Sequence, residues 1–180
     1  MRGANQLLNA SGVLSALEAL HDRLPVFAQA VRQGLARVEL PGRFQIVPGR
    51  PAIVLDVAHN PHAAAHLARN LDNMGFFPQT WAVLGMLKDK DLDRTIAALA
   101  RVVDHWIVCD LPGPRAASAT LLAERLRAIL PGTAGTVASA ATPADGLRLA
   151  KAGADENDRI VVFGSFLTVA DVYRICVHDR

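Results

Sequence analysis

The sequence predicts an α/β fold: a mostly parallel sheet of about six strands with helices on both faces, preceded by a short helical segment. Two observations lead to this prediction. After residue 43, short apolar runs alternate with longer segments whose apolar residues recur at helical spacing. Most of the short runs are continuously apolar, which is typical of parallel strands buried on both faces.

The first 40 residues show only helical patterns. One apolar stripe is formed by Val13, Leu14, Leu17 and Leu20, and another by Phe27, Val31 and Leu35. Pro25 suits the first position of the second helix. Leu40-Pro41-Gly42-Arg43 then breaks the pattern. We therefore expect a first domain, or part of one, over residues 1–42 and a second over residues 43–180.

The apolar runs of the second domain give the expected strands, which are Phe44–Val47, Ala52–Val57, Trp81–Met86, Trp106–Asp110, Thr136–Ala138 and Arg159–Gly164. The helical faces between them are Ala64/Leu67/Leu71/Met74, Leu92/Ile96/Leu99 and Leu122/Leu126/Ile129. Gly75 is the expected stop of the first of these helices. A fourth helix should open at Thr142-Pro143 and end at Gly153, and the last should span Phe166–Val177.

Ligands of such sheets bind at the carboxyl ends of the strands. The polar and glycine-rich segments of this sequence follow expected strand ends, at Asp56, Gly85–Asp91, Asp110–Arg115 and Gly164-Ser165. Because parallel strands place these ends at one edge of the sheet, the sequence predicts a binding site there.

The densest of these segments is Asp56-Val57-Ala58-His59-Asn60-Pro61-His62. Asn60 is a favourable N-cap and Pro61 a favourable first helical residue, so a helix should begin there and offer its free N–H groups to an anion. Asp56 could accept hydrogen bonds from ribose hydroxyls or hold a metal. Alternatively, Asp56 and Asn60 only tie the turn.

Three histidines follow in this region, and His62 and His66 share a helix face at a spacing of four residues. No acidic residue stands between them at helical spacing, so we interpret both as surface residues and expect no metal in this chain. His59 lies in the turn at the expected ligand edge, and we take it as functional.

Other candidates are weaker. Arg43, in the junction between the domains, offers a planar fork for a phosphate or carboxylate, but it could also be a solvated linker residue. Lys90 could contact an anionic substrate or belong to a solvated loop. Ser165 could hold a carboxylate at a helix start, and it lacks the pattern of a nucleophile elbow. Cys109 is expected to be a buried small apolar residue.

Composition excludes several classes of protein. The chain has 180 residues, with 19 Lys and Arg against 17 Asp and Glu, and no basic run that would indicate nucleic-acid binding. The two cysteines are far apart and fit a reducing, cytoplasmic location. No apolar run reaches the roughly 18 residues of a membrane span, and the first residues do not form a signal peptide.

Three sets of residues together resemble one family. Asn9-Ala10, Leu40-Pro41-Gly42-Arg43-Phe44-Gln45 and Asp56-Val57-Ala58-His59-Asn60-Pro61 are similar to the Mur ligase superfamily, and within it to folylpolyglutamate synthase/dihydrofolate synthase. Two further segments match the same branch, Gly85 with Asp89-Lys90-Asp91, and Gly164-Ser165-Phe166 with Thr168-Val169. The resemblance covers nearly the whole chain and implies the Rossmann-like C-terminal domain of a Mur ligase, preceded by the helical end of a central ATPase domain.

The resemblance implies an ATP-dependent amide ligase that forms an acyl phosphate, which the amino group of L-glutamate attacks. The acceptor would be dihydropteroate or a tetrahydrofolate. Asn9 matches the family's asparagine that contacts the nucleotide base, and Arg43 matches the arginine at the phosphates. Asp56 matches the acidic residue that contacts the nucleotide. His59 would order the site, and Lys90 and Ser165 are weaker candidates for contacts to glutamate. Mg²⁺ would accompany ATP.

The sequence departs from the family in one respect, since it contains no Gly-Lys pair and hence no phosphate-binding loop. We expect that loop and the Mg²⁺ ligands in an N-terminal ATPase domain of the same enzyme, and we expect this chain alone to be an inactive monomer.

Three alternatives remain. The first is a metal-dependent hydrolase built on Asp56 and the three histidines. The second is a signalling receiver phosphorylated on Asp56, although the chain lacks that class's acidic pair and lysine. The third is a non-catalytic interaction module.

Overall fold

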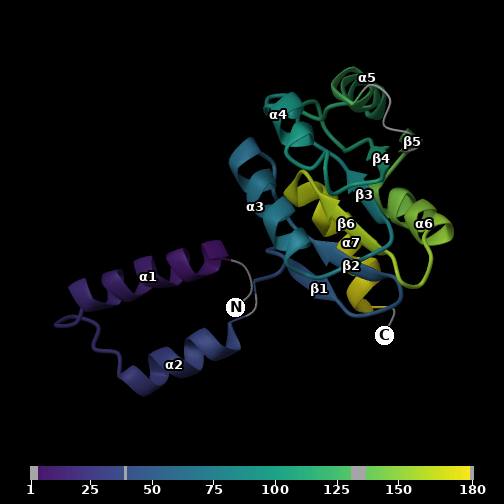
Figure 1. Cartoon of the computed structure of the whole chain (residues 1–180). Coiled ribbons are helices and arrows are strands. Elements are labelled where there is room, and N and C mark those ends of the chain that lie inside the picture. The colour runs from purple at the N-terminus through teal and green to yellow at the C-terminus, as the bar shows by residue number, and fades with distance from the viewer. Residues whose placement is uncertain (1–3, 39, 131–136, 179–180) are drawn as a thin grey trace. The chain divides into compact units, whose positions relative to one another are not determined.

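A computed structural model describes residues 4–38, 40–130 and 137–178 of the chain (Figure 1). The chain forms two compact units, Met1–Pro41 and Gly42–Arg180. No helix among the described residues is long and apolar enough to cross a membrane.

The described residues of the first unit form two helices, α1 (Ala4–Ala19) and α2 (Ala28–Arg37). Large apolar side chains remain exposed on it, and Phe27 is 83% exposed. The prediction that Pro25 opens the second helix is wrong. Residues 25–27 are not helical, and Phe27, in extended conformation, is the N-cap of α2.

The second unit is built on a six-stranded sheet with the order β1-β2-β6-β3-β4-β5. The strands are β1 (Gln45–Val47), β2 (Ala52–Leu55), β3 (Thr80–Leu84), β4 (His105–Cys109), β5 (Val137–Ala140) and β6 (Arg159–Phe163). β1 pairs with β2 in antiparallel fashion, and every other neighbouring pair is parallel. The predicted mostly parallel sheet is therefore confirmed, with strand ends shifted by one or two residues. Thr136, the predicted start of the fifth strand, lies outside the described residues.

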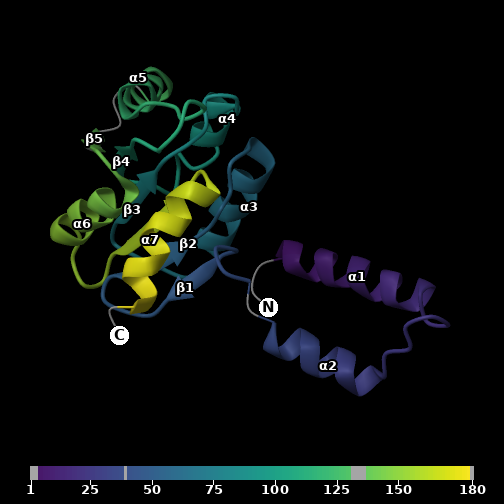
Figure 2. The ribbon, with the colours of Figure 1, turned by 180° about the vertical axis from the view of Figure 1, so that it is seen from behind.

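In the part of this unit that the structure describes, the sheet is covered by α3 (Pro61–Asp72), α4 (Leu92–Ala97), α5 (Ala119–Ile129), α6 (Pro143–Gly153) and α7 (Phe166–His178). Helices α3, α4 and α5 pack on one face of the sheet, and α6 and α7 pack on the other (Figures 1 and 2). Successive strand residues point to opposite faces of the sheet. Val54 packs in the first core, under α3, α4 and α5, and Leu55 packs in the second core, under α6 and α7. Helices on both faces were predicted, and the structure confirms them.

Local sequence signals account for the helix starts. The N-cap side chains of α3, α4, α5 and α6 each accept a hydrogen bond from a backbone N–H of the first turn, and these residues are Asn60, Asp91, Ser118 and Thr142. Pro61 and Pro143 occupy the first helical position, as predicted. Helix α3 ends at Asp72, ahead of Gly75, which has a φ of 97°.

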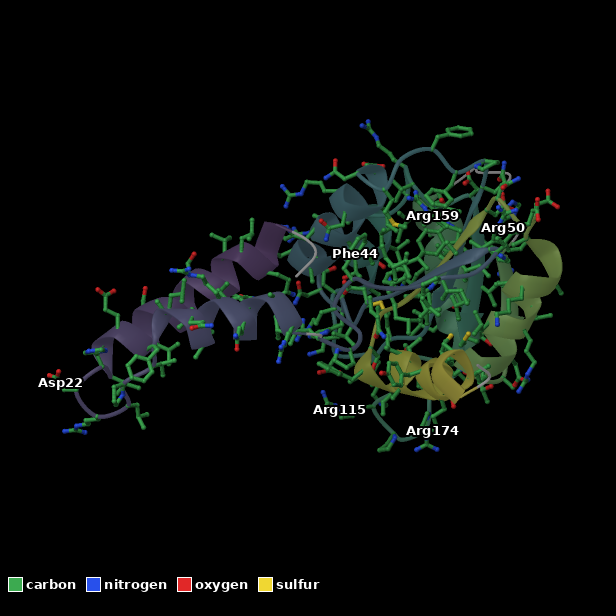
Figure 3. All side chains as sticks on the ribbon, turned by 90° about the horizontal axis from the view of Figure 1, so that it is seen from below. Asp22, Phe44, Arg50, Arg115, Arg159 and Arg174 are labelled. Atoms are coloured by element: carbon green, nitrogen blue, oxygen red, sulfur yellow. The ribbon has the colours of Figure 1, made fainter. Side chains whose placement is uncertain are left out.

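The topology gathers the predicted polar segments at one edge. Because β2, β6, β3 and β4 run parallel, their carboxyl ends lie together, and the residues that follow these ends are Asp56, Gly164, Gly85 and Asp110. We call this the carboxyl edge. Figure 3 shows Phe44, which precedes β1 at this edge, and Arg50, which follows β1 toward the opposite edge.

Candidate functional site

Asp56 joins two backbone segments at the carboxyl edge. Its Oδ1 accepts a hydrogen bond from the Ala58 N–H at 2.8 Å, and its Oδ2 accepts one from the Phe44 N–H at 2.9 Å. A backbone bond at 2.8 Å, from the Val57 N–H to the Gly42 carbonyl, ties the same segments a second time. The Arg43 turn and the loop between β2 and α3 are therefore held together as one structural element.

The turn has an unusual backbone that depends on these contacts. Gly42 has a φ of 68°, and Phe44 has a φ of 47°, which is rare for a bulky residue. The Gln45 Oε1 accepts a hydrogen bond from the Gly42 N–H at 3.0 Å. The Phe44 side chain is buried in the first core, so the residue between these two anchors, Arg43, is fixed at the edge of the sheet.

Burial dominates the ionisation of Asp56. It raises the pKa of this carboxyl above its ordinary value, while the hydrogen bonds from Ala58 and Phe44 and the charge of Arg43 act in the opposite direction. Each carboxylate oxygen has a second lone pair, so Asp56 can accept a further hydrogen bond from a ligand hydroxyl.

His59 and Asn60 occupy the loop that precedes α3. The His59 Nδ1 lies 2.8 Å from the Val57 carbonyl oxygen, which can only accept, so Nδ1 is the donor and Nε2 is the acceptor nitrogen of the neutral ring. Asn60 accepts from the Ala63 N–H at 2.9 Å and caps the helix. The structure thus fixes the tautomer of His59 beside a helix N-terminus, an environment that favours anions.

Phe166, the first residue of α7, lies beside two of these side chains. The Arg43 Cζ lies 5.6 Å from the centroid of the Phe166 ring, and the His59 and Phe166 rings are tilted with centroids 6.4 Å apart. The sequence indicated Phe166 as the start of a helix and as part of the Gly164-Ser165-Phe166 segment of the family resemblance, but not as a site residue. Its position directly after Gly164-Ser165, at the carboxyl end of a strand, is the feature of the sequence that could have indicated a place in the site.

The structure places Ser165 and Lys90 at the same edge in supporting contacts. Ser165 is buried, and its Oγ accepts from the Leu167 N–H at 3.1 Å, which caps the start of α7. The Lys90 Nζ lies 3.8 Å from the Asp89 Oδ2, which also pairs with the Arg115 Nη2 at 2.8 Å. Asn9 belongs to the first unit, where its exposed side chain donates to the Gln6 Oε1 at 3.2 Å. The assignment of these three residues to ligands stays a prediction.

His62 and His66 are surface residues on α3, as the sequence indicated. Their Nε2 atoms are 3.2 Å apart, and Arg69 donates to the His66 Nδ1 at 2.9 Å. Desolvation, then the charges of Arg69 and His62, lower the pKa of His66. Within residues 4–38, 40–130 and 137–178, no three His, Cys, Asp or Glu side chains come together as metal ligands.

Cys109 ends β4 inside the second core and is fully buried. Burial, together with nearby acidic residues, raises the pKa of its thiol to about 12. A thiol in this environment is a packing group, as predicted, because the nucleophilic form of cysteine is the thiolate.

Comparison with known proteins identifies the second unit. Residues 42–166 match the family model described as Mur ligase, glutamate ligase domain. The dihydrofolate synthase/folylpolyglutamate synthase of Escherichia coli (strain K12) is 42% identical over 167 residues, which are 93% of this chain and 37% of that protein. The Haemophilus influenzae protein of the same description is 35% identical and is matched over 42% of its length. The chain thus spans about two fifths of these relatives.

Solved structures agree with this result. The Escherichia coli FolC in complex with DHPP and ADP has a TM-score of 0.84 and 41% identity, over 96% of this chain and 39% of that one. The Mycobacterium tuberculosis folylpolyglutamate synthase with ADP and AMPPCP has a TM-score of 0.85 and 31% identity, over 98% and 41%. The matched segment begins at Gly42 and includes Arg43, Asp56, His59 and Phe166. The chain belongs to the Mur ligase, glutamate ligase domain family.

Proposed function

We propose that this chain supplies the glutamate-ligase part of an ATP-dependent amide ligase that adds L-glutamate to dihydropteroate, to tetrahydrofolate polyglutamates, or to both. The observation that supports this most strongly is the Asp56 carboxylate, which binds the Arg43 turn to the His59 loop. Relatives support the substrate class: their structures are described with ADP, with DHPP, and with AMPPNP and L-glutamate.

ATP fits the residues at this edge. Among the described residues, the Arg43 guanidinium forms no ion pair within 4.0 Å, so its donors are available to a phosphate. The second lone pairs of Asp56 can accept from ribose hydroxyls. We propose that Arg43 contacts the phosphates of the nucleotide, that Asn9 contacts its base, and that Asp56 also contacts the nucleotide. His59 orders the site. Lys90 and Ser165 are the proposed contacts to glutamate.

The proposed reaction has two steps. An oxygen of the acceptor carboxylate attacks the γ-phosphorus of ATP, and ADP leaves with the bonding electron pair. The glutamate amino group then attacks the acyl carbon and loses a proton, and phosphate leaves with the oxygen from the carboxylate. Arg43 stabilises the charge that builds up on the transferring phosphoryl group, which is the main contribution that proteins make in such transfers.

We assign further parts of the catalytic machinery to another domain. By resemblance to the family, we propose that the Mg²⁺ ligands and the phosphate-binding loop belong to an ATPase domain, whose helical end is residues 1–42. We further propose that the chain alone is inactive, and that it is monomeric and cytoplasmic.

A reconstitution assay tests the proposal. The chain is mixed with a separately produced ATPase portion of a related enzyme, and ATP-dependent attachment of labelled glutamate to dihydropteroate is followed. We expect product only when both parts and ATP are present. Product from the chain alone would disprove the dependence on an ATPase domain, and no product from a mixture shown to form a complex would contradict the proposed function.

Arg43→Ala locates the chemistry within this assay. If Arg43 acts on the transferring phosphoryl group, we expect Arg43→Ala to lower kcat by about 100-fold. The affinity for the nucleotide should fall by less. Arg125→Ala is the matched control, since this exposed arginine pairs with Asp93 at 3.3 Å on α4 and should leave both quantities unchanged. Equal losses of affinity and turnover in Arg43→Ala would contradict the assigned role.

A further inference from the structure

Phe166 combines an exposed side chain with a rigidly held backbone. The ring is 58% exposed, whereas Ser165 before it and Thr168 two residues later are buried. Single exposed apolar residues are common on protein surfaces and need no special explanation. Phe166 differs because its neighbours across the surface are Arg43 and His59, two residues of the candidate site.

The start of α7 is fixed by contacts with the loop after β3. Gly164 has a φ of 108°, and a Cβ there would lie 2.5 Å from the Gly85 carbonyl oxygen. The Thr168 Oγ1 donates to that same carbonyl oxygen at 2.7 Å. The base of the Phe166 side chain therefore has a fixed position relative to the sheet, even though the ring itself extends into solvent.

Arg43 lies over an aromatic ring, as Arg159 of the same unit lies over Phe77. The Arg43 Cζ lies over the Phe166 ring at 5.6 Å, and the described ion pairs do not include Arg43. An aromatic face attracts a guanidinium without accepting its in-plane hydrogen bonds. A carboxylate partner would occupy those donors and cancel the charge. The ring therefore orients Arg43 and keeps its N–H groups available to an anion.

We infer that Phe166 is a positioning residue for Arg43, and that its ring holds the guanidinium ready for a phosphate of the bound nucleotide. The His59 ring also lies beside the Phe166 ring, with the two centroids 6.4 Å apart, and it limits the space into which the Phe166 ring can rotate. The inference rests on the proposed function for the identity of the anion, but the orientation of Arg43 by Phe166 can be measured without activity.

The first measurement is nuclear magnetic resonance of the ¹⁵N-labelled 180-residue chain, with the Arg43 Nε–Hε signal assigned through Arg43→Lys. In the wild type we expect an ordered Nε–Hε vector, and in Phe166→Leu an order parameter below about 0.6. Phe166→Trp retains an aromatic face and should retain the order. Leu167→Ala, which removes the neighbouring exposed side chain, is the control and should match the wild type.

The second measurement is turnover in the reconstituted ligase. Phe166→Leu should lower kcat by about two- to fivefold, with KM for glutamate unchanged, and Phe166→Trp should restore it. Unchanged Arg43 order in Phe166→Leu overturns the inference whether or not the mixture is active. Equal kcat for wild type and Phe166→Leu in an active mixture also overturns it. If the mixture forms a complex but is inactive, and Arg43 loses order in Phe166→Leu but not in Phe166→Trp or Leu167→Ala, the proposed function is refuted and the orienting role of Phe166 is supported.

Discussion

Replacement of Asp56 by alanine tests whether one carboxylate holds the Arg43 turn against the His59 loop. The substitution leaves the N–H groups of Phe44 and Ala58 without their acceptor, and each partly buried, unpaired donor costs about 1–3 kcal/mol. Removal of a buried carboxylate offsets part of this loss, because burial disfavours its charged form. We expect a net loss of about 2–3 kcal/mol in the free energy of unfolding.

The two tryptophans make the measurement specific to the second unit. Trp81 and Trp106 lie in β3 and β4, and the chain contains no other tryptophan, so urea unfolding followed by fluorescence reports on the sheet. With a slope of about 2–3 kcal/mol per molar, the midpoint should fall by about 1 M. Asp93→Ala is the control, because its exposed ion pair with Arg125 is worth about 0.5 kcal/mol or less.

The fluorescence transition also gives the refuting outcome. A midpoint for Asp56→Ala equal to that of Asp93→Ala would show that the carboxylate does not tie the two segments. The positive φ of Phe44 would then need another source of stability, since the Gln45 contact reaches only Gly42.

Three further predictions concern the same unit. Because the pKa of Asp56 is raised above 3.8 in the folded state, the folded chain binds more protons than the unfolded chain between these two pKa values, so stability should fall as pH rises through that window. Urea midpoints from pH 3.5 to 7 should show this slope in the wild type and lose it in Asp56→Asn; the same slope in both would contradict the assignment. Gly164→Ala should lower the unfolding free energy by about 2–4 kcal/mol, because its Cβ would meet the Gly85 carbonyl oxygen at 2.5 Å. Gly49→Ala is the control, because a Cβ there would lie 3.5 Å from its nearest neighbouring atom, the Pro51 carbonyl oxygen, and it should lower the unfolding free energy by less than about 0.5 kcal/mol. Similar losses of unfolding free energy in both variants would contradict the predicted clash at Gly164. Cys109 should resist a thiol-specific reagent at pH 8 until urea unfolds the chain, and rapid labelling of the folded chain, located by mass spectrometry, would contradict its burial.

Local chemistry made most of the fold predictable. Runs such as Ile53-Val54-Leu55 are buried on both faces of the sheet, and this is why they are continuously apolar in the sequence. The pairs Asn60-Pro61 and Thr142-Pro143 combine a capping side chain with a residue preset for the first helical position. These signals act within a few residues, so the sequence alone indicated where α3 and α6 begin.

Long-range contacts explain what the sequence did not predict. Phe44 adopts a positive φ because Asp56, twelve residues later, accepts its N–H, and local preference disfavours that conformation. The grouping of Phe166 with Arg43 and His59 requires the sheet order, which places β6 next to β2. Pro25 shows the reverse error, since a favourable local signal did not start the helix at that point.

The route of one oxygen atom tests the proposed ligase chemistry most directly. Dihydropteroate labelled with ¹⁸O in its carboxylate is supplied with ATP and glutamate to the reconstituted enzyme, and the released phosphate is analysed by ³¹P resonance. The acyl phosphate pathway predicts one ¹⁸O in the phosphate for each amide formed, at a rate that Arg43→Ala lowers. Amide formation with unlabelled phosphate, or labelled phosphate formed at the same rate in Arg43→Ala, would contradict it.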